Sequence, residues 1–133
     1  VIAVKNEVKE VLFLLEKNHE EQIQIKTINI LKKGAQKFDF KLNESVSSFY
    51  AAPLTYLYEP NAALLKSGGF HHIATQLNVF KLHQHSHLYT SENILDFPGR
   101  VFKIETVISY DKKQISKLVS DKKANITTRN FPK

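Results

Sequence analysis

The sequence predicts an α+β fold of two small packed units, in which helices and strands alternate along the chain. Three observations carry this prediction. Hydrophobic residues make up 42% of 133 residues, enough for one compact domain or two very small ones. Apolar residues recur with helical spacing in some segments and with strand alternation in others. Glycine, proline and asparagine separate these segments.

The first unit is expected over residues 1–50, in the order β-α-β-β. The apolar opening "VIAVK" has the pattern of a buried strand. Asn6 would cap a helix in "NEVKEVLFLLEK", whose apolar residues recur at i, i+3, i+4 and i+7. "EQIQIKTINIL" and "KFDFKL" alternate as strands do, with Gly34 in the loop between them. This order is typical of a ferredoxin-like half.

The second unit is expected over residues 53–133, in the order α-α-β-β-α-β, after an irregular linker that reaches Pro60. A short helix from about Asn61 to Lys66 should stop at Ser67-Gly68-Gly69, where glycine supplies the left-handed cap, and a second helix should follow. Strands are expected in "VFKLHQHSHLYTS", "VFKIETVISY" and "ANITTRNF". Asp111 should cap a helix in "KKQISKLVS", between the last two strands.

Composition excludes several classes of chemistry. Cysteine is absent, which excludes disulfides, thiolate metal sites and cysteine nucleophiles and fits a cytoplasmic protein. No apolar run approaches the roughly 20 residues of a membrane span. Methionine is also absent, and both ends read as parts of longer elements, so we expect an excised piece of a larger protein.

Positive charge is concentrated in the second half of the chain. Residues 1–66 carry nine lysines and eight acids, whereas residues 67–133 carry ten lysines or arginines and five acids. A local basic excess favours a polyanionic partner such as nucleic acid; a merely solubilising surface is the alternative.

Four motifs occur in order across residues 56–132: "YLYEPNAALLKSG", "KLHQHSHLYTS", "DFPGRVFKI" and "NITTRNFP". Together they resemble the THUMP-like C-terminal region of a family of bacterial class I S-adenosylmethionine-dependent methyltransferases. "VIAVKNEVKEVLFLLE" resembles the small ferredoxin-like domain that precedes this region in some members.

The resemblance implies an accessory region downstream of a methyltransferase domain that is missing here. THUMP domains are generally found in RNA-modifying enzymes, so RNA is the implied partner. The resemblance further implies that the THUMP-like unit continues beyond "RNFP". S-adenosylmethionine is expected for the parent protein only. Its binding needs a glycine-rich turn after a first strand, whereas Gly68 and Gly69 follow a helix. We therefore expect no catalytic residue, cofactor site or metal in this chain, and its oligomeric state stays open.

Basic residues of the second half are the candidates for contacts with RNA phosphates, because they neutralise charge and release counterions. They are Arg100, Lys103, Lys112, Lys113, Lys117, Lys122, Lys123 and Arg129. Such contacts position RNA without reading its sequence. A solvated basic face is the alternative.

Tyr56, Tyr58 and Asn61 form a second candidate group. A tyrosine could stack on an unpaired base while Asn61 or Arg100 contacts the sugar-phosphate. We favour the alternative, in which the rings pack the first helix of the second unit against its sheet.

Histidine supplies a rival signal, because His83, His85 and His87 would share one face of a strand and could hold Zn²⁺. No Asp or Glu lies nearby to support them, so we favour a polar face without metal. The sequence therefore predicts an RNA- or substrate-docking region. The alternative is a structural or protein-interaction region that supports the catalytic domain or a dimer.

Overall fold

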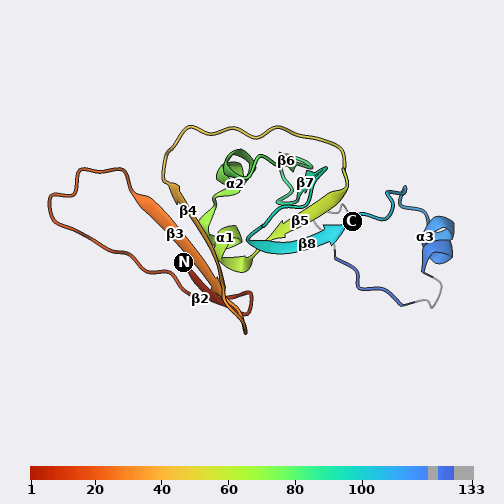
Figure 1. The fold of residues 1–133 in the computed structure, drawn as a ribbon, viewed down its shortest axis with the longest axis horizontal. Helices are drawn as coiled ribbons and strands as arrows, with labels where there is room; N and C mark the ends of the chain where they lie inside the picture. The colour runs from red at the N-terminus through yellow and green to blue at the C-terminus, as the bar shows by residue number, and fades with distance from the viewer. Residues whose placement is uncertain (120–122, 128–133) are drawn as a thin grey trace.

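Two four-stranded sheets enclose two short helices, α1 and α2 (Figure 1). The structure is a computed structural model that describes residues 1–119 and 123–127. Strands from both sheets and residues from both helices share one buried cluster, so the two halves of the chain fold against each other. The predicted α+β class is confirmed, with more strand and less helix than the sequence indicates.

The first sheet is built from residues 2–41. Its strands are β1 (Ile2–Val4), β2 (Glu7–Glu10), β3 (Gln24–Ile30) and β4 (Ala35–Lys41), in the spatial order β2-β1-β3-β4. β1 lies parallel to β3, while β1–β2 and β3–β4 are antiparallel hairpins. Gly34, at φ 81°, supplies the left-handed residue of the predicted β3–β4 turn.

The predicted helix over "NEVKEVLFLLEK" is wrong, and the first unit reads β-β-β-β. Lys5 and Asn6 both adopt positive φ, at 50° and 65°, and turn the chain into a hairpin in which Val8 faces Ala3. The Asn6 carboxamide oxygen accepts from the backbone N–H of Ala62, at the start of another helix. Asn6 therefore helps to cap α1 instead of opening a helix of its own.

The second sheet is antiparallel throughout. Its strands are β5 (Tyr56–Pro60), β6 (Phe80–Lys81), β7 (Tyr89–Ser91) and β8 (Gly99–Lys103), in the order β6-β7-β5-β8. The predicted irregular linker before Asn61 is wrong, because its last five residues form the central strand β5. The predicted strand after Asn78 is interrupted by a turn, and the one after Gly99 ends at Lys103.

The three helices of the second half follow the sequence signals. They are α1 (Ala62–Ser67), α2 (Phe70–Gln76) and α3 (Lys112–Leu118). The Asn61 side chain accepts from Leu64 N–H, and Gly68 ends α1 at φ 80°. Asp111 caps α3 as predicted. Of the predicted strand "ANITTRNF", residues 124–127 form no strand, and the remainder lies outside the described residues.

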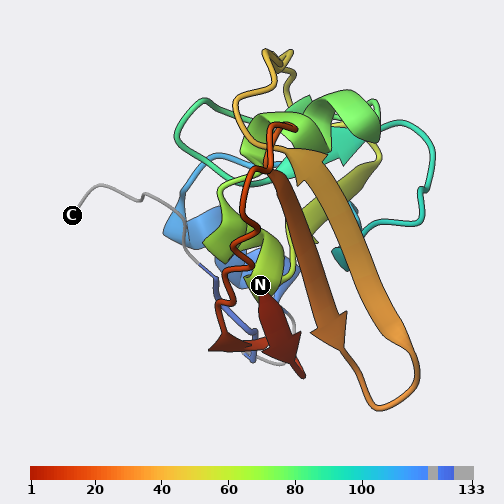
Figure 2. The same cartoon turned by 90° about the vertical axis from the view of Figure 1, so that its left-hand side faces the viewer.

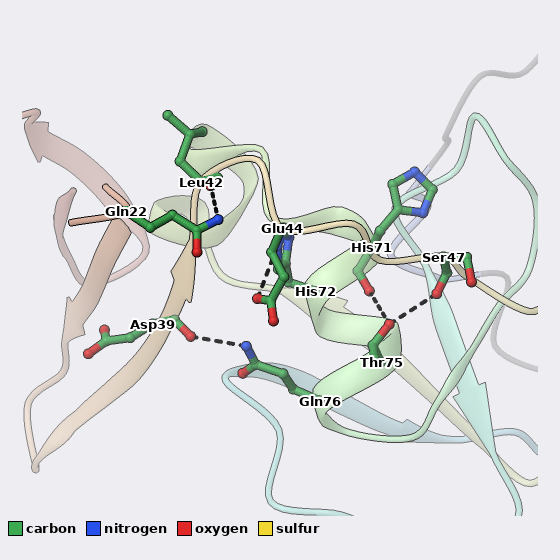
Figure 3. Close-up of polar contacts among 9 residues, drawn as sticks. All are labelled: Gln22, Asp39, Leu42, Glu44, Ser47, His71, His72, Thr75 and Gln76. Carbon is green, nitrogen blue, oxygen red and sulfur yellow. Dashed lines mark hydrogen bonds and ion pairs between the residues drawn. The ribbon is translucent and has the colours of Figure 1, made fainter. Parts of the chain in front are cut away.

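Helix α2 is hydrogen-bonded both to β4 of the first sheet and to the loop that follows β4 (Figure 3). A Cβ on Gly69 would lie 2.6 Å from the Phe40 ring, so only glycine lets α2 begin this close to β4. The Gln76 amide donates to the Asp39 carbonyl at 3.2 Å, and the Thr75 hydroxyl to the Ser47 carbonyl at 3.0 Å. These bonds hold α2 over β4 and residues 43–49.

The side chain of Tyr58 is central to the buried cluster and should carry a large share of the stability. The ring has no exposed surface, and its hydroxyl lies 2.8 Å from Ser91 Oγ and accepts from Leu95 N–H. We expect Tyr58→Ala to lower the free energy of unfolding by about 3–5 kcal/mol, by analogy with buried Phe→Ala. Tyr58→Phe should cost about 1–3 kcal/mol, because buried polar partners lose the hydroxyl.

Urea unfolding followed by circular dichroism would measure both changes. Tyr50→Phe is the matched control, because half of Tyr50 is exposed. If Tyr58→Phe unfolded with the same free energy as Tyr50→Phe, the hydroxyl network would be irrelevant to stability.

Candidate nucleic-acid interface

Strand β8 carries the first of the candidate basic residues. It pairs with β5 along its whole length, from Tyr56 opposite Lys103 to Pro60 opposite Gly99. A Cβ on Gly99 would lie 2.1 Å from the Glu59 carbonyl oxygen, so glycine is required where β8 begins. β8 is the edge of its sheet, and residues 100–103 are exposed.

Arg100 is the only basic candidate on the described chain that also forms an ion pair. Its guanidinium bonds the Glu59 carboxylate, whose side chain is only 8% exposed. The same guanidinium lies over the Phe102 ring, 5.6 Å from its centroid. Arg100 therefore compensates a buried charge and leaves little of its own charge for a phosphate.

Phe102 is a candidate that the sequence reasoning missed. The residue is 44% exposed, and its ring lies on the same face of β8 as Arg100. Aromatic rings on an exposed strand can serve as platforms for unpaired bases. The sequence does contain a signal for Phe102. It lies two residues after Arg100, and this spacing places both side chains on one face of a strand.

The remaining described lysines lie on or near α3. Lys112, Lys113 and Lys117 are exposed, and no residue of α3 is buried. Lys103 and Lys123 are exposed as well. Figure 1 shows α3 beyond the end of β8 and apart from the two sheets. Lys122 and Arg129 lie outside the described residues.

Two members of the tyrosine motif lie in the core, and the third is partly buried. Tyr58 is fully buried, and Asn61 is buried as the N-cap of α1. Tyr56 is partly buried and packs against the same cluster. These positions agree with the packing interpretation and leave the Tyr58 ring no surface for a base.

The three candidate histidines do not share one face of a strand. His83 begins a turn closed by the Ser86 N–H to the His83 carbonyl, and His85 lies within it, with the two ring centroids 5.4 Å apart. His87 stacks instead on Phe70, with ring centroids 3.6 Å apart. Within residues 1–119 and 123–127, no group of three or more His, Cys, Asp or Glu side chains is placed to hold a metal.

Among the described residues, no helix has the length and apolar character that a membrane span requires.

Comparison with known families identifies two domains. Residues 56–98 match a family of ferredoxin-like domains, and residues 99–133 match a family described as THUMP domain-like. The chain therefore contains a ferredoxin-like domain followed by a THUMP-like domain. No curated protein matches the chain.

A solved structure is similar over nearly the whole chain. It is the crystal structure of a putative methyltransferase from Porphyromonas gingivalis W83, with 39% sequence identity and a TM-score of 0.87. The similarity covers 99% of this chain and 35% of that one. The chain thus spans about a third of the length of its structural neighbour.

The boundary between the two family matches falls within the second sheet. It separates β5 from β8, although these strands pair along their whole length. The two matched segments therefore share one sheet, through β5 and β8. The division predicted from the sequence, at residues 1–50 and 53–133, stays a prediction.

The ion pair should make Arg100 contribute more to stability than Lys103, which is exposed on the same strand. Arg100→Ala removes the guanidinium that bonds the buried Glu59 carboxylate, so we expect a loss of about 1–3 kcal/mol in the free energy of unfolding. Lys103→Ala, an exposed change on the same strand, should stay within about 0.5 kcal/mol of the parent. Equal denaturant midpoints for the two variants would contradict this assignment.

His87 should make stability depend on pH. Burial, and secondarily the nearby charge of Lys81, lower its pKa in the folded chain. The unfolded chain therefore binds this proton more readily, and stability should fall as pH drops below the ordinary histidine value of about 6.5. Thermal unfolding between pH 7.5 and 5 should show the fall, and His87→Gln should make it smaller. An unchanged pH profile in His87→Gln would assign the dependence to another group.

Proposed function

We propose that this chain is the accessory region of a S-adenosylmethionine-dependent methyltransferase, and that its role is to dock RNA or another polyanionic substrate. The observation that carries the proposal is the THUMP-like match over residues 99–133. All but one of the basic candidates on the described chain are exposed in this segment without a described partner, and THUMP domains are generally found in RNA-modifying enzymes.

The similarity to a protein named as a putative methyltransferase supports the first part of the proposal, that the chain belongs to a methyltransferase. The catalytic domain and its S-adenosylmethionine site would lie in the part of a longer protein that these 133 residues do not include. The left-handed Gly68 at the end of α1 is a helix cap, which agrees with this assignment. A cytoplasmic location is part of the same proposal, since the chain has no cysteine.

Docking would use two kinds of contact. The lysines of α3 would neutralise phosphates, and Phe102 on β8 would offer a ring to an unpaired base. Arg100 would act mainly by holding Phe102 in place, because its own charge is engaged by Glu59.

An interaction region that supports the catalytic domain is the second candidate function. The observation that favours it is a run of five large apolar side chains, Val11–Leu15, all of them exposed. Lack of RNA binding by a folded chain at low salt would favour this candidate over docking.

RNA binding should be weak, sequence-tolerant and steeply dependent on salt. With about four to six phosphate contacts, the slope of log K against log salt should be on the order of −3 to −5. Lys112→Ala, Lys113→Ala and Lys117→Ala should each reduce the magnitude of this slope by roughly one unit and leave the fold intact. Fluorescence anisotropy with a labelled single-stranded RNA, between 50 and 200 mM salt, would measure it.

Lys32→Ala and Lys33→Ala are the matched controls, because both lysines are exposed in the β3–β4 turn, outside the THUMP-like match. If they changed the slope as much as the α3 variants did, binding would be a diffuse effect of net charge. Phe102→Ala should weaken binding without changing the slope, since a stacked ring releases no counterion.

A further inference from the structure

The chain between β4 and β5 forms one wall of a groove against α2 and β6. It passes over these two elements on its way from one sheet to the other (Figures 1 and 2). The Thr75 hydroxyl of α2 bonds the Ser47 carbonyl oxygen (Figure 3). The next residue, Ser48, places its Oγ 2.8 Å from Nδ1 of His71. These contacts hold residues 45–49 beside the helix, and the groove between them has a volume of about 280 Å³.

Two phenylalanine rings lie side by side in this groove. Tyr50 pairs with Lys81 in a parallel bridge, in which the Lys81 N–H donates to the Phe49 carbonyl at 2.9 Å. This register places Phe49 opposite Phe80, so the two rings project from the same face. Both line the groove, and they are 74% and 40% exposed. Lys81 projects from the opposite face and is buried. The two rings therefore form an apolar platform at the β6 edge of the second sheet.

The carboxamide of Asn78 is a polar group of the same groove. Asn78 directly follows α2 in the left-handed conformation, at φ 51°, as residues that end helices commonly do. This backbone role does not use the side chain, which forms no hydrogen bond with any other residue in the described part of the chain. A carboxamide carries donors and an acceptor together, so it can bond two neighbouring atoms on the edge of a base, as asparagine does with adenine.

The lining as a whole indicates a flat, uncharged ligand with a polar edge. Nine described residues line the groove; five are apolar, four are polar, and none is charged. An aliphatic ligand would cover the rings but leave the hydroxyl and amide groups without hydrogen bonds. A phosphate or carboxylate would find no cation among the lining residues. The volume lies near the lower limit of small-ligand sites, roughly 300 Å³, so it suits one ring system.

We propose that this groove binds one unpaired nucleobase, which stacks against Phe49 and Phe80 and accepts and donates hydrogen bonds at Asn78. RNA would supply the base; this source rests on the proposed function. A free nucleotide fits less well, because the lining offers no charge to its terminal phosphate. The site is distinct from Phe102, since β6 and β8 lie at opposite edges of the second sheet.

NMR titrations of the full 133-residue chain test the proposal with hexaadenylate RNA, adenosine, ribose and indole. We expect hexaadenylate and adenosine to shift the amide resonances of residues 45–49 and 74–80, and ribose to shift none of them. Hexaadenylate should bind more tightly than adenosine, because its phosphates add contacts. Indole that bound the groove as tightly as hexaadenylate would overturn the proposal, in favour of an aromatic side chain of a partner protein.

Substitutions identify the groups that hold the base. Phe49→Ala should weaken hexaadenylate binding at least fivefold, because a stacked ring is lost. Phe49→Tyr should retain binding. Asn78→Gly keeps the left-handed backbone and removes the carboxamide, so binding should weaken about threefold or more.

Phe13→Ala is the matched control, because it removes a ring that is 85% exposed and lies outside the groove. We expect it to leave hexaadenylate binding unchanged. Equal losses in Phe49→Ala and Phe13→Ala would overturn the proposal.

Two outcomes separate this site from the docking function. RNA binding that shifts resonances of α3 and β8 but none of the groove would overturn the base site and leave docking standing. Adenosine binding in the groove without hexaadenylate binding at low salt would contradict docking, and with it RNA as the source of the base, whereas the groove would stand as a nucleobase site.

Discussion

The fold depends on one buried cluster in which side chains from both sheets close over two short helices. Phe38 and Phe40 of β4 meet Ile73 of α2 from one side, and Tyr58 of β5 meets the cluster from the other. Helices of six and seven residues are unstable alone in water, so α1 and α2 exist because this cluster buries them. Each sheet depends on the other to shield the apolar side chains of its inner face from water.

This constraint explains which sequence signals were reliable. Asn61, Gly68 and Asp111 act on backbone groups within three residues of themselves, so local chemistry fixes where α1 and α3 begin and where α1 ends. β5 was missed because a strand with β7 and β8 on its two sides is defined by distant partners. Its residues show no clear alternation, since three of the five are buried.

The candidate interface was predictable in its charge and less so in its geometry. Net charge indicated the second half of the chain, but not that the carboxylate of Glu59 would engage Arg100. That pair forms because register places Glu59 opposite Arg100 across β5 and β8. It also positions the guanidinium over Phe102, so a ring that composition did not single out becomes the exposed aromatic feature of the edge strand. The charge distribution indicated which half of the chain carries the candidate interface. The pairing of β5 with β8 determines which of its side chains remain available there.

The wrong helix at residues 6–17 has a simple physical origin. Any continuous apolar run contains the helical spacing i, i+3, i+4 and i+7, so periodicity alone cannot separate a helix from a strand buried on both faces. The left-handed Lys5–Asn6 turn decides the matter, because it folds β2 back along β1. The run that follows β2 is exposed and forms no helix, so its apolar pattern alone does not define an element.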